Sequence, residues 1–191
     1  PDVLQKHMIT KKRKMSMSKG VLTVVSGFSG AGKGTVMKRL IQKYDDYALS
    51  ISVTTRNPRE GERDGIEYFF KTKEEVETMI ENEFLEYARY VDNYYGTPRF
   101  YVEEMLAKGK NVILEIEIQG AMQIKAKNPE AVLVFVTPPS FEELRNRLVG
   151  RGTETEDVIE KRLKRATEEA EGIENYDYIV INDQVEDCAD R

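Results

Sequence analysis

The sequence Gly27-Phe28-Ser29-Gly30-Ala31-Gly32-Lys33-Gly34-Thr35 is a glycine-rich stretch with a single lysine. It follows the apolar run Val21-Leu22-Thr23-Val24-Val25 and opens a segment whose apolar residues recur at helical spacing. A strand, a glycine-rich turn and a helix in this order are the setting of a phosphate-binding loop. In such a loop successive backbone N–H groups face one anion, and Lys33 would reach the β- and γ-phosphates. The alternative is an ordinary glycine-rich turn that carries a surface lysine.

The loop departs from the usual pattern at one position. The pattern has Ser or Thr directly after the lysine, where the hydroxyl binds Mg²⁺. Here Gly34 holds that position, and Thr35 follows one residue later. Direct coordination of magnesium by a hydroxyl of this loop is therefore not predicted.

Composition excludes several classes of protein. A chain of 191 residues suits one domain with small insertions, and a net charge of −5 argues against a nucleic-acid partner. The single cysteine, Cys188, cannot form an internal disulfide, which is typical of a reducing cytoplasm. We find no stretch apolar enough to cross a membrane and no export leader.

Residues 1–19 are expected to be a disordered tail or a leader outside the fold. This tail contains the only histidine, His7, and the basic cluster Lys11-Lys12-Arg13-Lys14, for which a nuclear-localisation signal is an alternative interpretation. Because no histidine lies in the fold itself, hydrolase triads and most zinc sites are excluded.

The rest of the chain is typical of an α/β fold. Runs rich in Val, Ile and Leu predict buried parallel strands at 21–26, 111–118, 132–136 and 178–182. Helical patterns lie between most of them; one begins at a capping box of Ser140 and Glu143, and another extends over about 156–173. The chain ends at Arg191, soon after the last predicted strand, and the sequence leaves open whether a closing helix is missing. We expect a three-layer core with a parallel sheet, formed by residues 20–52 and 99–191.

Residues 53–98 interrupt this alternation. Turn signals, short aromatic β-like pieces at 66–70 and 84–91 and a short helix near 74–81 predict a small, mostly β insertion. Within it, Arg56 and Arg59 flank a turn, and arginines placed in this way can clamp a phosphate. A solvated loop with ion pairs to Glu60 and Glu62 is equally compatible with the segment taken alone.

These features together resemble the guanylate kinases, P-loop enzymes that transfer the γ-phosphate of ATP to GMP. The resemblance extends from about Gly20 to Asp183. Besides the loop, it rests on several separate blocks: Thr54-Thr55-Arg56 with Pro58-Arg59 and Gly61-Glu62, Phe84-Leu85-Glu86-Tyr87-Ala88, Asn93-Tyr94-Tyr95-Gly96-Thr97, Gln119-Gly120, Pro138-Pro139-Ser140, and Arg147-Leu148 with Gly150-Arg151-Gly152-Thr153.

The resemblance implies roles for individual residues. The insertion would bind GMP: Arg56, Arg59, Tyr68 and Tyr95 at the phosphate, Glu62 orienting the arginines, and Ser52, Glu86 and Thr97 at the guanine. The ATP site would comprise Gly27, Ser29, Gly30, Ala31, Gly32, Lys33, Gly34 and Thr35, with Asn182 near adenine. Lys33, Arg147, Arg151 and Arg162 would be catalytic, the three arginines belonging to a lid near residues 150–158.

Two glutamates fall where many guanylate kinases carry aspartates that serve magnesium and the guanine side. Glu115 and Glu117 are two residues apart in the predicted strand, so they would share one face near its carboxyl end, where ligands gather in α/β sheets. We expect Mg²⁺ near Thr35 and Glu115, held through water, and Glu117 on the GMP side. A structural ion pair is the alternative.

The sequence thus predicts an ATP-dependent nucleoside monophosphate kinase that converts ATP and GMP to ADP and GDP with Mg²⁺, without a covalent intermediate. One alternative is a catalytically silent guanylate-kinase-like module that binds partner proteins. Another is a relative that phosphorylates a different small phosphate, although Glu86 and Thr97 argue against it.

Overall fold

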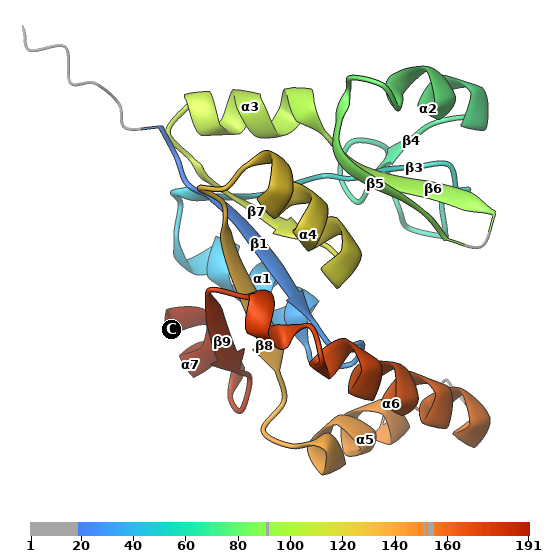
Figure 1. The fold of residues 1–191 in the computed structure, drawn as a ribbon, viewed down its shortest axis with the longest axis vertical. Helices are drawn as coiled ribbons and strands as arrows, with labels where there is room; N and C mark the ends of the chain where they lie inside the picture. Colours follow the sequence, from blue (N-terminus) through green and yellow to red (C-terminus); the bar gives the residue numbers. More distant parts are fainter. Residues whose placement is uncertain (1–18, 91, 151, 153–154) are drawn as a thin grey trace, which may run out of the picture.

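Five parallel strands form the central sheet of the computed structural model (Figure 1). The structure describes residues 19–90, 92–150, 152 and 155–191. In spatial order the strands are β2 (Tyr47–Leu49), β7 (Asn111–Glu115), β1 (Leu22–Gly27), β8 (Val132–Thr137) and β9 (Tyr178–Ile181). With β1 between β7 and β8, the loop that follows β1 opens at the carboxyl edge of the sheet. This is the edge where α/β folds bind ligands.

Alternate residues along these strands enter two separate cores. Val24 of β1 and Leu114 of β7 pack on one face, with α3 (Arg99–Ala107) and α4 (Ile118–Lys127). Val25 and Ile113 pack on the other face, with α1 (Lys33–Lys43) and α7 (Val185–Asp190). Because both faces are covered, the strands read as continuous apolar runs. The predicted three-layer α/β fold is confirmed.

A second sheet lies beside the first and contains β3 (Val53–Thr54), β4 (Phe69–Phe70), β5 (Phe84–Tyr90) and β6 (Asn93–Pro98), in the order β4-β3-β6-β5. Helix α2 (Lys73–Met79) packs on it through Val76 and Met79, beside Val53 and Phe84. A reciprocal capping box of Thr72 and Glu75 begins α2. All these elements fall within residues 53–98, although the division of the chain into functional units stays a prediction.

Two helices, α5 (Phe141–Gly150) and α6 (Glu156–Ala170), form the end of the molecule opposite the second sheet (Figure 1). The Ser140 hydroxyl accepts from the Glu143 backbone N–H at 3.0 Å, whereas the Glu143 carboxylate accepts from Arg147 Nε at 2.7 Å. The short helix η1 (Ile173–Asn175) leads into β9. Among the described residues, no helix combines the length and apolar character needed to span a membrane.

The structure differs from the predicted elements in three places. The strand predicted at 111–118 ends at Glu115, and Glu117 is the N-cap residue of α4. The apolar pattern continues past the strand because Ile116 and Ile118 still pack against the core. Strand β2, with only three residues, was not predicted. Helix α7 follows β9, where the sequence left the presence of a closing helix open.

Candidate active site

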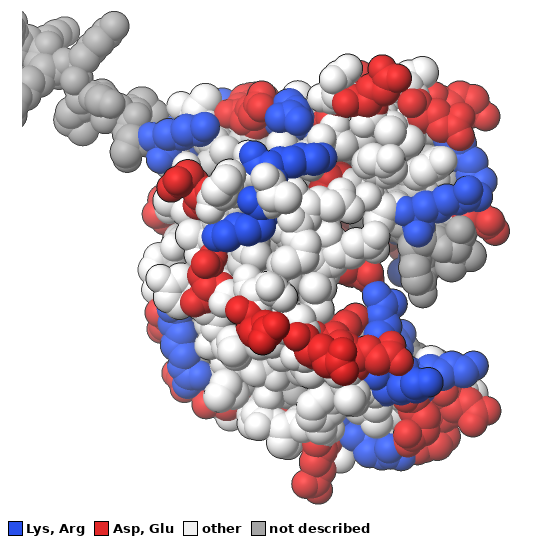
Figure 2. Space-filling view, viewed as in Figure 1, with Lys and Arg blue, Asp and Glu red and all other residues white. Residues whose placement is uncertain are grey.

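A cleft of about 760 Å³ lies between α6 and the segments that lead into β3 and β4 of the second sheet (Figure 2). Gly27, Ser29 and Lys33 line it from the loop after β1, and Glu115 lines it from the end of β7. Basic side chains of α6 gather on the opposite wall, namely Lys161, Arg162 and Arg165. The cleft therefore combines a glycine-rich loop with a positively charged wall, a combination that suits a polyphosphate.

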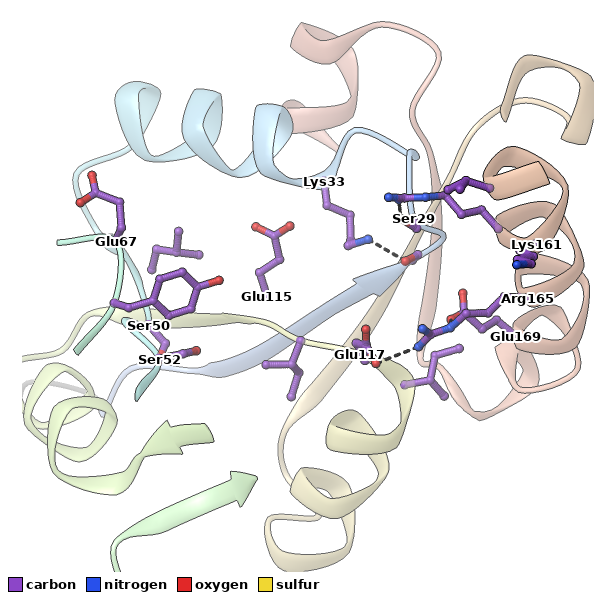
Figure 3. Close-up of a pocket in the computed structure, with 17 residues that line it drawn as sticks. Ser29, Lys33, Ser50, Ser52, Glu67, Glu115, Glu117, Lys161, Arg165 and Glu169 are labelled. Atoms are coloured by element: carbon purple, nitrogen blue, oxygen red, sulfur yellow. Dashed lines mark hydrogen bonds and ion pairs between the residues drawn. The ribbon is translucent and has the colours of Figure 1, made fainter. Parts of the chain in front are cut away.

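The loop has the backbone geometry of an anion cradle. Gly30 and Gly32 adopt φ of 98° and 88°, a region that side chains disfavour. A Cβ at Gly32 would also lie 2.6 Å from Asn182 Nδ2. The Lys33 ammonium donates to the carbonyls of Gly27 at 2.6 Å and Phe28 at 3.1 Å, so its charge lies over the loop (Figure 3).

Phe28 attaches this loop to the hydrophobic core. Its ring is 3% exposed and lies 5.0 Å from the ring of Phe135 on β8 and 5.5 Å from that of Phe141 on α5. Phe135 in turn contacts Tyr176, at 5.1 Å between ring centres. This aromatic cluster therefore anchors the loop at Phe28.

Asn182 and Arg147 hold the loop from behind. Asn182 is 3% exposed, and its Nδ2 donates to the Ala31 carbonyl at 2.8 Å. Arg147 donates to the Ala31 carbonyl at 3.3 Å and to the Asn182 carbonyl at 2.9 Å. In this structure the Asn182 side chain therefore supports the loop backbone, and its place near adenine stays a prediction.

Helix α6 contributes two arginines to the cleft. Arg162 donates to the Ser29 hydroxyl at 2.5 Å, which brings the helix to the loop. Arg165 donates to Glu117 Oε2 at 2.9 Å and to Glu169 Oε1 at 2.8 Å (Figure 3). Arg151, expected in the same group, lies outside the described residues.

Glu115 lies at the base of the cleft, beside the first turn of α1. A Cβ added to Gly34 would lie 3.8 Å from each carboxylate oxygen of Glu115. The side chain is open to the cleft, but the protein around it removes part of its hydration; this raises the pKa of Glu115, and the charge of Lys33 opposes the shift. Thr35 is exposed on α1 and is not among the residues that line the cleft.

A smaller cavity of about 290 Å³ adjoins the cleft and shares Ser52, Tyr68, Glu115, Ile116 and Glu117 with it. Its far end is lined by Glu86, Tyr95 and Gly120. A Cβ at Gly120 would lie 2.8 Å from Glu86 Oε2, so glycine leaves the room that the carboxylate occupies. The two cavities together can hold two ligands end to end.

Glu86 is a buried carboxylate with one strong partner. It is 5% exposed, and the Thr97 hydroxyl donates to its Oε1 at 2.6 Å. Burial raises the pKa of Glu86, while the hydrogen bonds from Thr97 and the charge of Lys127 oppose the shift. The structure thus brings Thr97 and Glu86 together, and the contact of Thr97 with the base stays a prediction.

The Arg56 guanidinium forms a bidentate pair with Glu62, with both N–O distances at 3.0 Å. It also lies over the rings of Tyr68 and Phe70, at 5.4 and 5.9 Å from their centres. The Arg59 backbone N–H donates to Glu62 at 2.7 Å, while its side chain is exposed. Arg56 keeps the pKa of Glu62 below its ordinary value, so the pair stays ionised.

Sequence reasoning missed several residues that line or support these cavities. Arg165 and Glu169 carry a signal that was available, because they lie three and seven positions after Arg162 on one helix face. Two others have no signal that a single sequence reveals. They are Phe70, whose ring lies under Arg56, and Ser50, which lines the cleft.

Comparisons with known proteins agree on one family. The guanylate kinase family model matches residues 19–191. The chain is 59% identical over 179 residues to a guanylate kinase of Bacillus anthracis, covering 93% of this chain and 87% of that protein. It is 57% identical over 176 residues to one of Clostridioides difficile (strain 630), covering 92% and 86%. The crystal structure of guanylate kinase from Anaplasma phagocytophilum is similar, with a TM-score of 0.71, 36% identity and coverage of 91% and 82%. The chain therefore belongs to the guanylate kinase family.

Proposed function

We propose that this protein transfers the γ-phosphoryl group of ATP to GMP and releases ADP and GDP. The observation that carries this proposal is the pair of connected cavities, one with the phosphate loop and the other with the buried Glu86. The two cavities share five lining residues, so ligands bound in them would lie next to each other. The family membership of the chain supports the same reaction. The intact phosphate loop with Lys33 argues against a catalytically silent protein-interaction module.

On the ATP side, residues 27–35 would bind the β- and γ-phosphates through their backbone N–H groups. Lys33 would turn from the carbonyls of Gly27 and Phe28 to the phosphate oxygens. Asn182 would hold the loop in its conformation through its hydrogen bond to the Ala31 carbonyl.

On the GMP side, the Arg56 guanidinium would bind the phosphate, and its bidentate pair with Glu62 would hold it in orientation. Arg59, Tyr68 and Tyr95 would complete the phosphate site. Glu86, held by Thr97, would accept from guanine N1–H and the 2-amino group. Ser52 and Glu117 would contact the base from the part of the cavity that opens to the cleft.

Transfer needs no side-chain base, because the attacking GMP phosphate oxygen is already an anion. That oxygen forms a bond to the γ-phosphorus while the bond to the bridging oxygen of ADP breaks. Lys33, Arg162 and the lid residue Arg151 would neutralise charge on the transferred group, and Arg147 would hold the loop behind it. No residue of the cleft needs to carry the phosphoryl group covalently.

Magnesium fits the donor set at the base of the cleft. Mg²⁺ is commonly held by one or two carboxylates together with phosphate oxygens and waters. Glu115 supplies a carboxylate beside the loop lysine, and Thr35 would act at most through water. When bound, the ion would screen the phosphate charges and orient them for transfer.

We also propose that the protein works in the cytoplasm on nucleotides, without nucleic-acid or membrane partners. The free, buried Cys188 is compatible with a reducing compartment. The net charge of −5 disfavours binding to a polyanion.

The test of the proposed function is an ADP-release assay with ATP, Mg²⁺ and each of GMP, AMP, CMP and UMP. We expect rapid turnover with GMP and negligible turnover with AMP, since adenine lacks the N1–H and 2-amino donors that Glu86 requires. Sites that match polar groups in this way discriminate by about 10⁴-fold. Turnover without preference for GMP would contradict the proposal.

Acidification should weaken GMP use because Glu86 must be ionised to accept hydrogen bonds. Its pKa is raised by burial, so protonation begins at a higher pH than for an ordinary glutamate, and the KM for GMP should rise as the pH falls. For stability the sign is opposite: the folded state binds this proton more tightly, so Glu86 destabilises the fold at neutral pH and less so at low pH.

The measurement is the KM for GMP between about pH 5 and pH 8, compared with the same profile of Glu86→Gln. The phosphate of GMP itself titrates near pH ~6 in both proteins, so only the difference reports Glu86. Identical profiles would show that Glu86 does not control GMP binding in this range.

A further inference from the structure

Arg165 connects the helix that carries the basic wall to the smaller cavity. It follows Arg162 by three positions on α6, so both side chains leave the same face of the helix. Arg162 contacts Ser29 of the phosphate loop. Arg165 contacts Glu117 (Figure 3). One helix face therefore contacts both candidate substrate sites.

Glu117 is suited to be positioned by such a contact. As the N-cap residue of α4 it makes no side-chain hydrogen bond to its own helix. Its carboxylate instead receives the Arg165 Nη2 donor on Oε2 at 2.9 Å, while Glu117 lines both cavities. A carboxylate held at one oxygen has fewer orientations available and can still accept at the other.

Arg165 is itself oriented from its own helix. Glu169, one turn later, accepts from Arg165 Nε at 2.8 Å. The guanidinium plane is thus fixed on one edge by Glu169 and presents Nη2 to Glu117. A planar, multiply donating group can serve two carboxylates in this way, which a lysine cannot reproduce.

We propose that Arg165 is a positioning residue for guanine recognition: it holds Glu117 so that the carboxylate accepts from the 2-amino group of GMP. This inference rests on the proposed function. In the free protein the pair is solvent-exposed, with side chains 46% and 71% accessible, and contributes little to stability. When a base covers Glu117 and excludes water, the same pair strengthens. The effect should therefore fall on GMP binding rather than on folding.

The experiment compares Arg165→Ala with the native protein in steady-state kinetics with GMP and with inosine monophosphate. The base of inosine monophosphate keeps N1–H and O6 but lacks the 2-amino group. We expect Arg165→Ala to raise the KM for GMP by about tenfold, to lower the preference for GMP over inosine monophosphate, and to leave the melting temperature nearly unchanged. Arg165→Lys should recover part of the loss.

The matched control is Arg39→Ala, which removes another exposed Arg–Glu pair between two elements, with Glu186 on α7, away from both cavities. Arg39→Ala should leave the KM for GMP and the KM for inosine monophosphate unchanged. In a Glu117→Gln background, Arg165→Ala should add little, because Arg165 acts through that carboxylate. An equal loss in both backgrounds would overturn the inference, as would an unchanged KM in an enzyme that uses GMP normally. A native protein that does not phosphorylate GMP would instead overturn the proposed function, and this inference with it.

Discussion

Replacing Lys33 by alanine should lower kcat by about 10²–10³, the range found when one preorganised electrostatic stabiliser is removed. The ammonium lies over the loop, bonded to the carbonyls of Gly27 and Phe28, and is the cation of the loop that can reach the transferred phosphoryl group. The measurement is steady-state turnover with saturating ATP and GMP, with circular dichroism as the check on folding. Because the loop is fixed by Phe28, the variant should remain folded.

Lys38→Ala is the matched control, since Lys38 is an exposed lysine on the same helix and does not line the cleft. It should retain native turnover. Near-native turnover in a folded Lys33→Ala protein would contradict the assignment of residues 27–35 as the phosphate loop.

Glu86→Gln should reduce kcat/KM for GMP by about 10²-fold or more. An amide accepts at one atom but sets its own donor against the N–H groups of guanine at the other, which leaves buried polar groups unpaired. The Thr97 hydroxyl can still donate to the amide oxygen, so the local packing should be retained. The measurement is kcat/KM for GMP and for AMP, from which the ratio gives the selectivity.

Glu83→Gln serves as the control, because Glu83 is exposed just before β5 and lies outside the cavity. It should not change the ratio. If Glu86→Gln keeps the native preference for GMP over AMP, then Glu86 is a structural carboxylate and another group reads the base.

The α/β core was predictable because its signals are local. A glycine-rich turn between an apolar strand and a helix specifies the first strand, loop and helix with little help from the rest of the chain. Strand β2 was missed because three half-buried residues leave no pattern. The end of β7 was misplaced because Ile116 and Ile118 pack against the core as loop and helix residues, and burial alone does not distinguish these states.

The connections between the candidate site residues could not be predicted from the sequence. Residue types and the family resemblance bring Glu86 and Thr97 together, yet only the fold shows that the hydroxyl of one is bonded to the carboxylate of the other. The hydrogen bond from Asn182 to the Ala31 carbonyl likewise appears only in the structure. The contact between Arg165 and Glu117 joins residues 48 positions apart, which no local pattern can reveal.

The packing of the Phe28 ring limits which parts of this protein can move. The Phe28 ring is buried and contacts Phe135 and Phe141, so the loop cannot open at Phe28 without disturbing the core. Its shape is then set during folding, and a nucleotide arriving there has little chain entropy to remove. Any rearrangement that brings two phosphate chains together must therefore be supplied by the parts around the loop, the second sheet on one side and the basic helix on the other.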